Sequence, residues 1–138
     1  MSVDPSGWTP IGVSSNADFY EIEPQILAVV PFEGATDDAA TARESVAIQL
    51  EYLRRTGIRA GVVVFMDRVI EQDSGARAVY RDAPDPTVQE CFALVGGTPF
   101  GRAVGSLFIG LSPPRVPTRM FATLDDALGW IRARLARK

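Results

Sequence analysis

The sequence predicts a single α/β domain in which helices pack on a mostly parallel sheet of about five strands. Two observations lead to this prediction. Apolar runs typical of buried strands alternate with segments of helical periodicity, and the 138 residues match the usual size of one domain. Strands that alternate with helices imply right-handed crossovers and parallel pairing. We therefore expect the order ββαβαβαβα, with one antiparallel strand at the start of the sheet.

The N-terminal part of the chain predicts an arm followed by a hairpin. Residues 1–16 contain two prolines, two glycines and a Ser-Ser-Asn run, so we expect a flexible arm with Trp8 as its candidate anchor. The segment ADFYEI at 17–22 alternates apolar and polar residues, and QILAVVPF at 25–32 is a dense apolar run. These two segments predict an antiparallel hairpin that begins a single domain spanning 17–138.

The longest predicted helix lies in GATDDAATARESVAIQLEYLRRTG, residues 34–57. Its apolar residues recur at intervals of three and four and form one stripe, made of Ala39, Ala42, Val46, Leu50 and Leu53. Thr36 is the expected N-cap, with Asp37 and Asp38 in the first turn. Gly57 follows the last turn, where glycine commonly ends a helix.

The second half of the chain predicts three further strands and three further helices. AGVVVFMD and ECFALVGG are β-branched or apolar runs of the kind found in strands buried on both faces. Thr98 and Pro99 are a cap and first-turn pair, and Thr123 begins a capping-box-like helix start. In chain order we expect a strand at 60–67, a helix at 74–82, a strand at 90–97, a helix at 99–111, a strand at 118–122 and a helix from 124.

The residue inventory removes most routes to catalysis. The chain has no histidine, and its only lysine is Lys138. Ser-His and Cys-His activation, histidine metal sites and internal Schiff-base chemistry are therefore excluded. The single cysteine, Cys91, excludes an internal disulfide and is expected in the core. Carboxylates and tyrosines remain as acid–base groups, but no convergent set is visible, so we expect no enzyme, no cofactor and no metal site.

Charge and hydropathy exclude two kinds of partner. The formal net charge is −3, whereas duplex-binding domains usually carry a concentrated basic patch, so we expect no nucleic acid. No apolar run approaches the roughly 18 residues of a membrane span, and the N-terminus lacks the basic-then-apolar order of a signal peptide. Because a single cysteine also fits a reducing compartment, we expect a cytoplasmic protein.

Three features together resemble the SpoIIAA-like family, also described as STAS/SEC14-like domains. They are the apolar strand that ends in Asp67, the passage GGTPFGRAVGSLFIGL at 96–111 and the closing segment RMFATLDDALGWIRARL at 119–135. The resemblance extends from about Ala17 to the C-terminus. It implies a mostly non-enzymatic module for protein interaction, in a family of which some members bind nucleotides or lipids.

The turn Asp73-Ser74-Gly75 is a candidate regulatory site. In the anti-sigma-factor antagonists of the resembled family, a serine in an Asp-Ser-Ser-Gly-like turn after a strand is phosphorylated by a partner kinase. Ser74 holds the matching position, although the second serine of the pair is missing. The same residues also form an ordinary helix start, in which Asp73 or Ser74 is the cap and Gly75 closes the turn. A phospho-switch and a plain cap are both open.

The helix predicted after the Gly-Gly-Thr turn is apolar on more of its circumference than contact with one sheet requires. Phe100, Val104 and Leu107 lie on the face expected to meet the sheet, whereas Phe108 lies on the flank and Ile109 points away. Three interpretations are open. Neighbouring helices cover these side chains, or they form a dimer or partner surface, or they border a pocket for an apolar ligand.

The turn Gly96-Gly97-Thr98 is a candidate phosphate cradle, because free N–H groups at a helix start attract anions. Tight packing of the turn is the ordinary alternative to a nucleotide site. For the whole chain we expect a protein-interaction or regulatory module that binds another protein, or itself as a homodimer. The alternative is a carrier or sensor of a small apolar or lipid-like molecule held between the sheet and the helix at 99–111.

Overall fold

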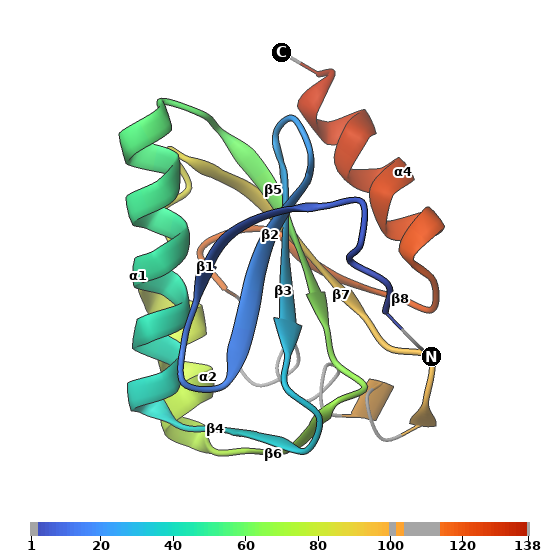
Figure 1. The fold of residues 1–138 in the computed structure, drawn as a ribbon. Helices are drawn as coiled ribbons and strands as arrows, with labels where there is room; N and C mark the ends of the chain where they lie inside the picture. The colour runs from blue at the N-terminus through green and yellow to red at the C-terminus, as the bar shows by residue number, and fades with distance from the viewer. Residues whose placement is uncertain (1–2, 100–101, 104–113, 138) are drawn as a thin grey trace.

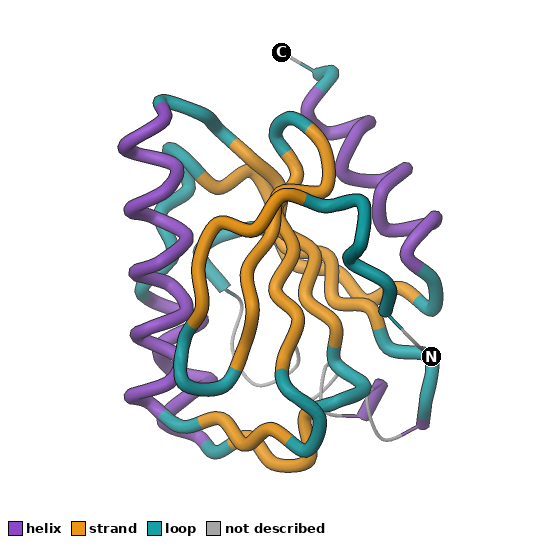
Figure 2. The backbone as a smooth tube through the Cα atoms, in the orientation of Figure 1, coloured by secondary structure: helices purple, strands orange, loops and turns teal. Residues whose placement is uncertain are grey.

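The computed structural model describes residues 3–99, 102–103 and 114–137. Within them the chain forms a central sheet with helices on both sides (Figures 1 and 2). The strands are β1 (Thr9–Val13), β2 (Ala17–Glu23), β3 (Ile26–Pro31), β4 (Ala35–Asp37), β5 (Ala60–Phe65), β6 (Val69–Gln72), β7 (Gln89–Val95) and β8 (Thr118–Phe121). The helices are α1 (Ala39–Thr56), α2 (Ser74–Asp82) and α4 (Leu124–Leu135).

The main sheet has six strands in the spatial order β1-β2-β3-β5-β7-β8. Strands β1, β2 and β3 pair antiparallel, whereas β3, β5, β7 and β8 pair parallel. The predicted α/β fold, with a mostly parallel sheet and an antiparallel start, is confirmed. The predicted count of about five strands is wrong, because β1 adds a sixth strand at the edge.

Strand β1 lies within residues 1–16, for which the sequence predicts a flexible arm. Its sequence, TPIGV, contains a proline and a glycine and is largely exposed, so it lacks the alternation that marks a strand. Backbone pairing with β2 places it at the sheet edge, where proline is tolerated. Just before β1, Trp8 stacks on Phe65 with ring centroids 6.0 Å apart and meets Tyr20 edge-on at 5.8 Å. These contacts anchor the segment.

The predicted order ββαβαβαβα is also wrong in detail, because two short strands interrupt it. β4 follows β3, β6 follows β5, and the two pair parallel as a separate two-stranded sheet. With three and four residues, they are too short to show a period in the sequence. Because β4 extends to Asp37, α1 begins later than expected. Asp38, not Thr36, is its N-cap and forms a capping box with Thr41.

The helices cover the two faces of the main sheet separately (Figure 1), because strand side chains alternate between the faces. On the face covered by α1 and α2, the buried core comprises Ala17, Phe19, Leu27, Val29, Leu53, Ala60, Val62, Met66, Phe92, Leu94 and Val116. On the face covered by α4, it comprises Ile26, Ala28, Val30, Val63, Phe65, Cys91, Ala93, Val95, Ala127, Leu128 and Ile131. Among the described helices, none combines the length and hydropathy needed to cross a lipid bilayer.

Helix α4 approaches strand β5 closely at Gly61. A Cβ atom at this position would overlap Cγ2 of Ile131 and lie 3.2 Å from Sγ of Cys91, so only glycine leaves room for the helix. Cys91 is fully buried, as the sequence predicts, and burial raises the pKa of its thiol to about 12. The thiol is therefore a core group rather than a nucleophile.

Most helix start and stop signals act where the sequence predicts them. Helix α1 is followed by Gly57, whose φ of 70° is the left-handed conformation that glycine adopts without strain. Thr123 caps α4 by accepting a hydrogen bond from the N–H group of Asp126. The N–H group of Arg102 donates to the carbonyl of Thr98, but most of the helix predicted at 99–111 lies outside the described residues.

Candidate functional site

The parallel strands β3, β5 and β7 end at the same edge of the main sheet, toward the bottom of Figure 1. The turn between β1 and β2, the small sheet of β4 and β6, and the start of α2 lie at this edge too. In open α/β sheets, binding sites form at the carboxyl ends of the strands, because the loops diverge there and leave a crevice. Residues at this carboxyl edge are therefore the first candidates for a functional site.

The turn after β7 is held by Asp67, which lies just beyond β5. Its carboxylate accepts hydrogen bonds from the N–H groups of Gly97 at 3.0 Å and Thr98 at 3.1 Å, and from the Thr98 hydroxyl at 2.8 Å. Partial burial opposes ionisation, but these hydrogen bonds outweigh it and lower the pKa of Asp67. The N–H groups that would bind a phosphate thus hold a carboxylate of the chain itself, which disfavours the nucleotide interpretation.

Asp73 and Ser74 lie at the start of α2, beside the carboxyl edge. Asp73 is the N-cap, because its side chain accepts a hydrogen bond from the N–H group of Ala76 at 2.9 Å. Ser74 is the first helical residue, and both side chains are exposed. The capping role that the sequence left open therefore belongs to Asp73. Phosphorylation of Ser74 stays a prediction, and the Ser74 side chain is accessible.

The apolar residues predicted for a partner or ligand surface lie outside the described residues: Phe100, Val104, Leu107, Phe108 and Ile109. Of the predicted helix, Pro99, Arg102 and Ala103 are described, and all three are helical. The assignment of the five apolar residues to a dimer surface, a partner surface or a pocket therefore stays a prediction.

Three large hydrophobic side chains are exposed within the described residues, and all three lie at the carboxyl edge. Val13, the last residue of β1, is 61% exposed, Ile70 of β6 is 59% exposed, and Phe32, directly after β3, is 39% exposed. Hydrogen bonds connect the β1–β2 turn with the end of β3 and with β4, and β4 pairs with the strand of Ile70, β6. The N–H group of Phe32 donates to the carbonyl of Asn16, and the Asn16 side chain donates to the carbonyl of Thr36.

Exposed acidic side chains accompany these hydrophobic residues. They belong to the β3–β4 loop, the N-cap of α1, strand β6 and the N-cap of α2. We refer to the whole set as the carboxyl-end surface; it comprises Val13, Phe32, Glu33, Asp38, Ile70, Glu71, Asp73 and Ser74. The surface therefore combines apolar area with negative charge.

A cavity of about 60 Å³ lies beneath this edge, between the main sheet and the helices α1 and α2. Strands of the main sheet contribute apolar walls, among them Val29, Val64, Phe92 and Leu94. The polar part of the lining consists of Asn16, Asp37, Ser45, Gln49, Gln72 and Tyr80. No group of three or more His, Cys, Asp or Glu side chains is placed to hold a metal ion in the part of the chain that the structure describes.

Asp37, the last residue of β4, is the centre of the polar lining. It is 9% exposed and lies opposite Gln72 in the parallel pair of β4 and β6. Its carboxylate accepts hydrogen bonds from the hydroxyl of Thr41 at 2.6 Å, the hydroxyl of Tyr80 at 2.7 Å and the amide of Gln72 at 3.4 Å. Burial, together with the charge of Asp37, raises the pKa of Tyr80 well above its usual value, so Tyr80 stays protonated and donates.

Two further polar side chains lie on the buried face of α1. Ser45 and Gln49 are 4% and 2% exposed, and the Gln49 amide donates to the Ser45 hydroxyl at 3.2 Å. The buried amide of Gln89 in β7 donates to Gln49 at 2.9 Å. The apolar stripe of α1 alone does not predict this row of hydrogen-bonded side chains. A signal was present, since Gln49 lies three residues after Val46 and four before Leu53, which places it on the buried face.

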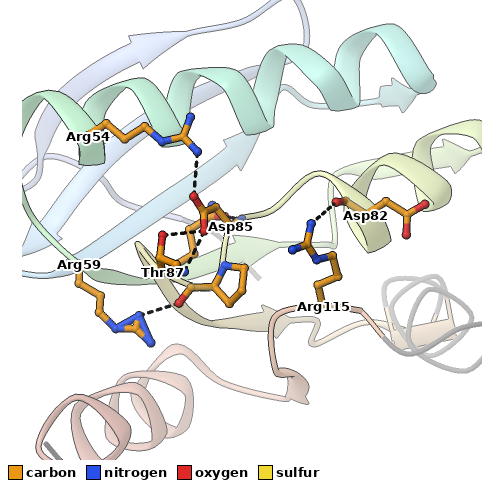
Figure 3. Close-up of polar contacts among 8 residues, drawn as sticks. Arg54, Arg59, Asp82, Asp85, Thr87 and Arg115 are labelled. Atoms are coloured by element: carbon orange, nitrogen blue, oxygen red, sulfur yellow. Dashed lines mark hydrogen bonds and ion pairs between the residues drawn. The ribbon is translucent and has the colours of Figure 1, made fainter.

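A second polar cluster lies at the other end of the parallel strands, where β5 and β7 begin. It joins the loop before β7 to α1 (Figure 3). Asp85 accepts hydrogen bonds from Arg54 at 2.8 Å and from the N–H and hydroxyl groups of Thr87 at 2.9 and 2.7 Å. Arg59 donates to the carbonyl of Pro86 at 3.0 Å. The bonds from Thr87 and Arg54 lower the pKa of Asp85 to about 2. These groups hold the loop in place, which is a structural role.

Comparisons with known proteins agree with this architecture. A family model described as a domain of unknown function, DUF7793, matches residues 20–134. Among solved structures, the chain is similar to an uncharacterized protein of the DUF3478 family from Shewanella loihica PV-4, which has a SpoIIAA-like fold. The sequence identity is 12%, the TM-score is 0.50, and the match covers 95% of this chain and 98% of that chain.

At such low identity, the similarity to the Shewanella protein concerns the fold and not the activity. A search of curated proteins finds no significant match. The SpoIIAA-like fold that the sequence suggests is confirmed. Because the family model spans most of the chain, the protein belongs to the DUF7793 family.

Proposed function

We propose that the protein is a non-catalytic SpoIIAA-like module that binds another protein through its carboxyl-end surface. The partner presents basic side chains around an apolar patch. The resemblance to protein-interaction modules favours this class of function, and the fold provides the scaffold for it.

The observation that carries the proposal is the grouping of exposed large hydrophobic side chains. Val13, Phe32 and Ile70 come from three separate segments, and all lie at one edge of the fold. A single exposed hydrophobic residue needs no explanation, but several at one edge, with polar residues beside them, are typical of an interaction surface.

The charge of the surface favours a different protein over a second copy of this chain. The exposed carboxylates of Glu33, Asp38, Glu71 and Asp73 accompany the hydrophobic side chains. Two copies that faced each other through this surface would bring like charges together, whereas a basic partner would be attracted. A homodimer formed through another surface, including the one predicted around Phe108, is a separate prediction.

The non-catalytic part of the proposal rests on the chemistry of the side chains. The chain lacks histidine and has lysine only at position 138. The thiol of Cys91 is buried, with a pKa raised to about 12. The hydroxyl of Tyr80 donates to Asp37 within the fold. Cys91 and Tyr80, whose side chains are of reactive types, therefore have structural roles. This supports a binding module over an enzyme.

A lipid-like ligand, the alternative function, has less support from the described residues. The cavity of about 60 Å³ has roughly a fifth of the volume of the smallest typical ligand pockets, which begin near 300 Å³. A lipid carrier would need a different and larger pocket. Native mass spectrometry of the purified protein would detect a co-purified lipid directly.

Site-specific photo-crosslinking in the cells that produce the protein tests the proposed surface. A photoreactive amino acid at Ile70 should capture one basic protein, whereas the same amino acid at Arg55, exposed near the other end of α1, should not. The captured protein is then purified and its affinity for the full-length chain measured. We expect Ile70→Ser to weaken binding roughly tenfold, as loss of an apolar anchor does, and Glu71→Gln to reduce the salt dependence.

Arg55→Ala is the matched control and should bind as the wild type does. The proposal is wrong if Ile70→Ser binds the captured protein with unchanged affinity, or if both crosslinker positions capture it equally. Ser74→Asp tests the switch in the same assay, because added negative charge should strengthen binding to a basic partner. If Ser74→Asp and Ser74→Ala bind the captured protein with equal affinity, Ser74 is not a phospho-switch, and the proposed binding surface is unaffected.

A further inference from the structure

We propose that the cavity around Asp37 binds a small alkylammonium ion. This site lies inside the fold, and its occupation does not depend on the protein partner proposed for the carboxyl-end surface. Among the described residues, the cavity combines a buried carboxylate without an ion-pair partner, a buried carbonyl oxygen without a donor, and apolar walls. Each of these three features points to the same class of ligand.

The carboxylate of Asp37 is held by neutral groups. Its donors are the hydroxyls of Thr41 and Tyr80 and the amide of Gln72. Five ion pairs join described residues, and none of them includes Asp37. A buried charge without a counter-charge is unfavourable. A cation in the adjoining cavity would supply that counter-charge.

Two arginines donate to backbone oxygens of residues that line the cavity. Arg77 donates to the carbonyl of Gln72 at 2.8 Å, and Arg68 donates to the carbonyl of Pro31 at 3.3 Å. Neither forms an ion pair with Asp37 within the described residues. The Nε of Arg77 is also buried and has no acceptor in the described part of the chain. The carboxylate of Asp37 therefore has no direct ion pair with either arginine, although Arg77 lies beside Gln72.

The amide of Gln72 provides a second acceptor next to the carboxylate. Its nitrogen lies 3.4 Å from Asp37, and its oxygen, Oε1, is buried and has no hydrogen-bond donor in the described part of the chain. A buried acceptor without a donor is costly. An ammonium group carries three donors and no acceptor. It would therefore satisfy Oε1 and neutralise the carboxylate together, whereas a neutral alcohol would add a further acceptor.

The size and walls of the cavity limit the organic part of the cation. An apolar cavity of about 150 Å³ binds benzene, so a volume of about 60 Å³ accommodates roughly two or three non-hydrogen atoms. Val29, Val64 and Leu94 line it and favour a methyl or ethyl group over a hydrated inorganic ion. Methylammonium and ethylammonium are therefore the expected ligands, and larger quaternary ammonium ions should not fit.

Methyl-group NMR of the full-length protein tests the site, with ethylammonium chloride as the probe. We expect saturable shifts of the methyl resonances of Val29, Val64 and Leu94. The Kd should be about millimolar, because so few atoms limit the attainable affinity. Sodium chloride is the control for ionic strength, and potassium chloride is the control for binding of an inorganic cation. Tetraethylammonium chloride is the control for an organic cation that is too large for the cavity. None of the three should reproduce the shifts.

Asp37→Asn removes the charge with little change in shape, and Glu51→Gln removes an exposed charge of α1 as the matched control. We expect Asp37→Asn to weaken ethylammonium binding roughly tenfold or more, and Glu51→Gln to leave it unchanged. Because Asp37 also contacts Thr41 and Tyr80, circular dichroism must show that the variant is folded. Gln72→Leu keeps Asp37 in place and should also weaken binding, so it decides the question if Asp37→Asn unfolds.

Three results would overturn the inference. Without saturable shifts, the cavity holds water alone. With equal shifts from potassium chloride, the ligand is an inorganic cation. If folded Asp37→Asn, or Gln72→Leu, binds ethylammonium with the affinity of the wild type, then ethylammonium binds at another place on the protein. None of these results bears on the partner captured at Ile70, so the two proposals fail separately.

Discussion

At the scale of single residues, Asp85 connects stability to pH. Its carboxylate accepts hydrogen bonds from Thr87 and Arg54, and its pKa in the folded protein is about 2, compared with about 3.9 for an unperturbed aspartate. A folded pKa below the unfolded one means that folding favours the ionised form. The stabilisation is therefore complete above about pH 4 and is lost as the pH falls toward 2.

Asp85→Asn should therefore lower the free energy of unfolding at pH 7 and lower it progressively less as the pH falls from about 4 to about 2. Urea unfolding of both proteins at several pH values measures this difference. Glu51→Gln, on the exposed side of α1, is the control for removal of one negative charge. A difference between wild type and Asp85→Asn that stays constant from pH 7 to pH 2 would contradict the assignment.

Asp37 and Asp38 show that neighbouring residues of one type acquire different roles. Asp38 is exposed, caps α1, and has its pKa lowered first by the hydrogen bond from the N–H group of Thr41. Asp37 is buried at the end of β4 and faces the cavity. The sequence predicts both in the first turn of one helix. The difference depends on where β4 ends, which is set by its pairing with β6.

At the scale of elements, the contact between α4 and β5 depends on the absence of one side chain. Gly61 lies in a strand otherwise made of larger apolar residues, and Ile131 of α4 occupies the space where a Cβ atom would be. Both Ile131 and Cys91 are fully buried, so neither has room to move aside. The fit of this helix to the sheet is therefore tight at a single point.

Gly61→Ala should destabilise the protein by about 1–3 kcal/mol, the usual cost of overpacking a core. Gly129→Ala, in α4 itself, has open space at the added Cβ and should instead stabilise by up to about 1 kcal/mol through helix propensity. Guanidinium unfolding of the two variants measures both effects. Equal unfolding midpoints for Gly61→Ala and wild type would show that α4 does not pack on β5 as described.

The short strands β4 and β6 are small elements with a large effect on the candidate site. Their parallel pairing places Asp37 opposite Gln72, which brings together the carboxylate and the amide of the proposed ammonium site. The same pairing places Ile70 and Glu71 in a strand at the carboxyl edge. Both proposed sites therefore depend on a ladder of a few residues.

At the scale of the whole molecule, the N-terminal segment completes the sheet. β1 pairs along β2, and Trp8 covers Phe65 and Tyr20 on the face that α4 also covers. The family match begins only at residue 20. The segment before it is nevertheless integrated into the fold by backbone pairing and by one large aromatic contact.

Removal of residues 1–16 should therefore lower the unfolding temperature and promote association, because the unpaired edge of β2 becomes a template for other chains. Thermal unfolding and size-exclusion chromatography with light scattering measure the two effects. Trp8→Ala in the full-length chain is the control, and it should lower the unfolding temperature while leaving the association state unchanged. A truncated chain that matches the full-length chain in both measurements would contradict the structural role of β1.

The sequence by itself determined the α/β class, the parallel centre of the sheet, the end of α1 and the start of α4. These features depend on local patterns: apolar runs, helical periodicity, and capping residues such as Thr123 and Gly57. Three segments of the sequence also resemble the SpoIIAA-like family, and the similarity to a structure with a SpoIIAA-like fold confirms that fold. Local patterns also identified Asp73 and Ser74 as a helix start, although they did not decide which residue is the cap.

The tertiary structure alone decided where β1, β4 and β6 lie and which polar residues share the cavity. Strands of three to five residues are too short to show a period in the sequence, and β1 also contains a proline and a glycine. β4 and β6 pair with each other across a stretch that contains α1 and β5. The approach of Asp37 to Gln72 and Tyr80 spans 35 and 43 positions of the chain. Such contacts arise from the packing of whole elements, and no local sequence pattern encodes them.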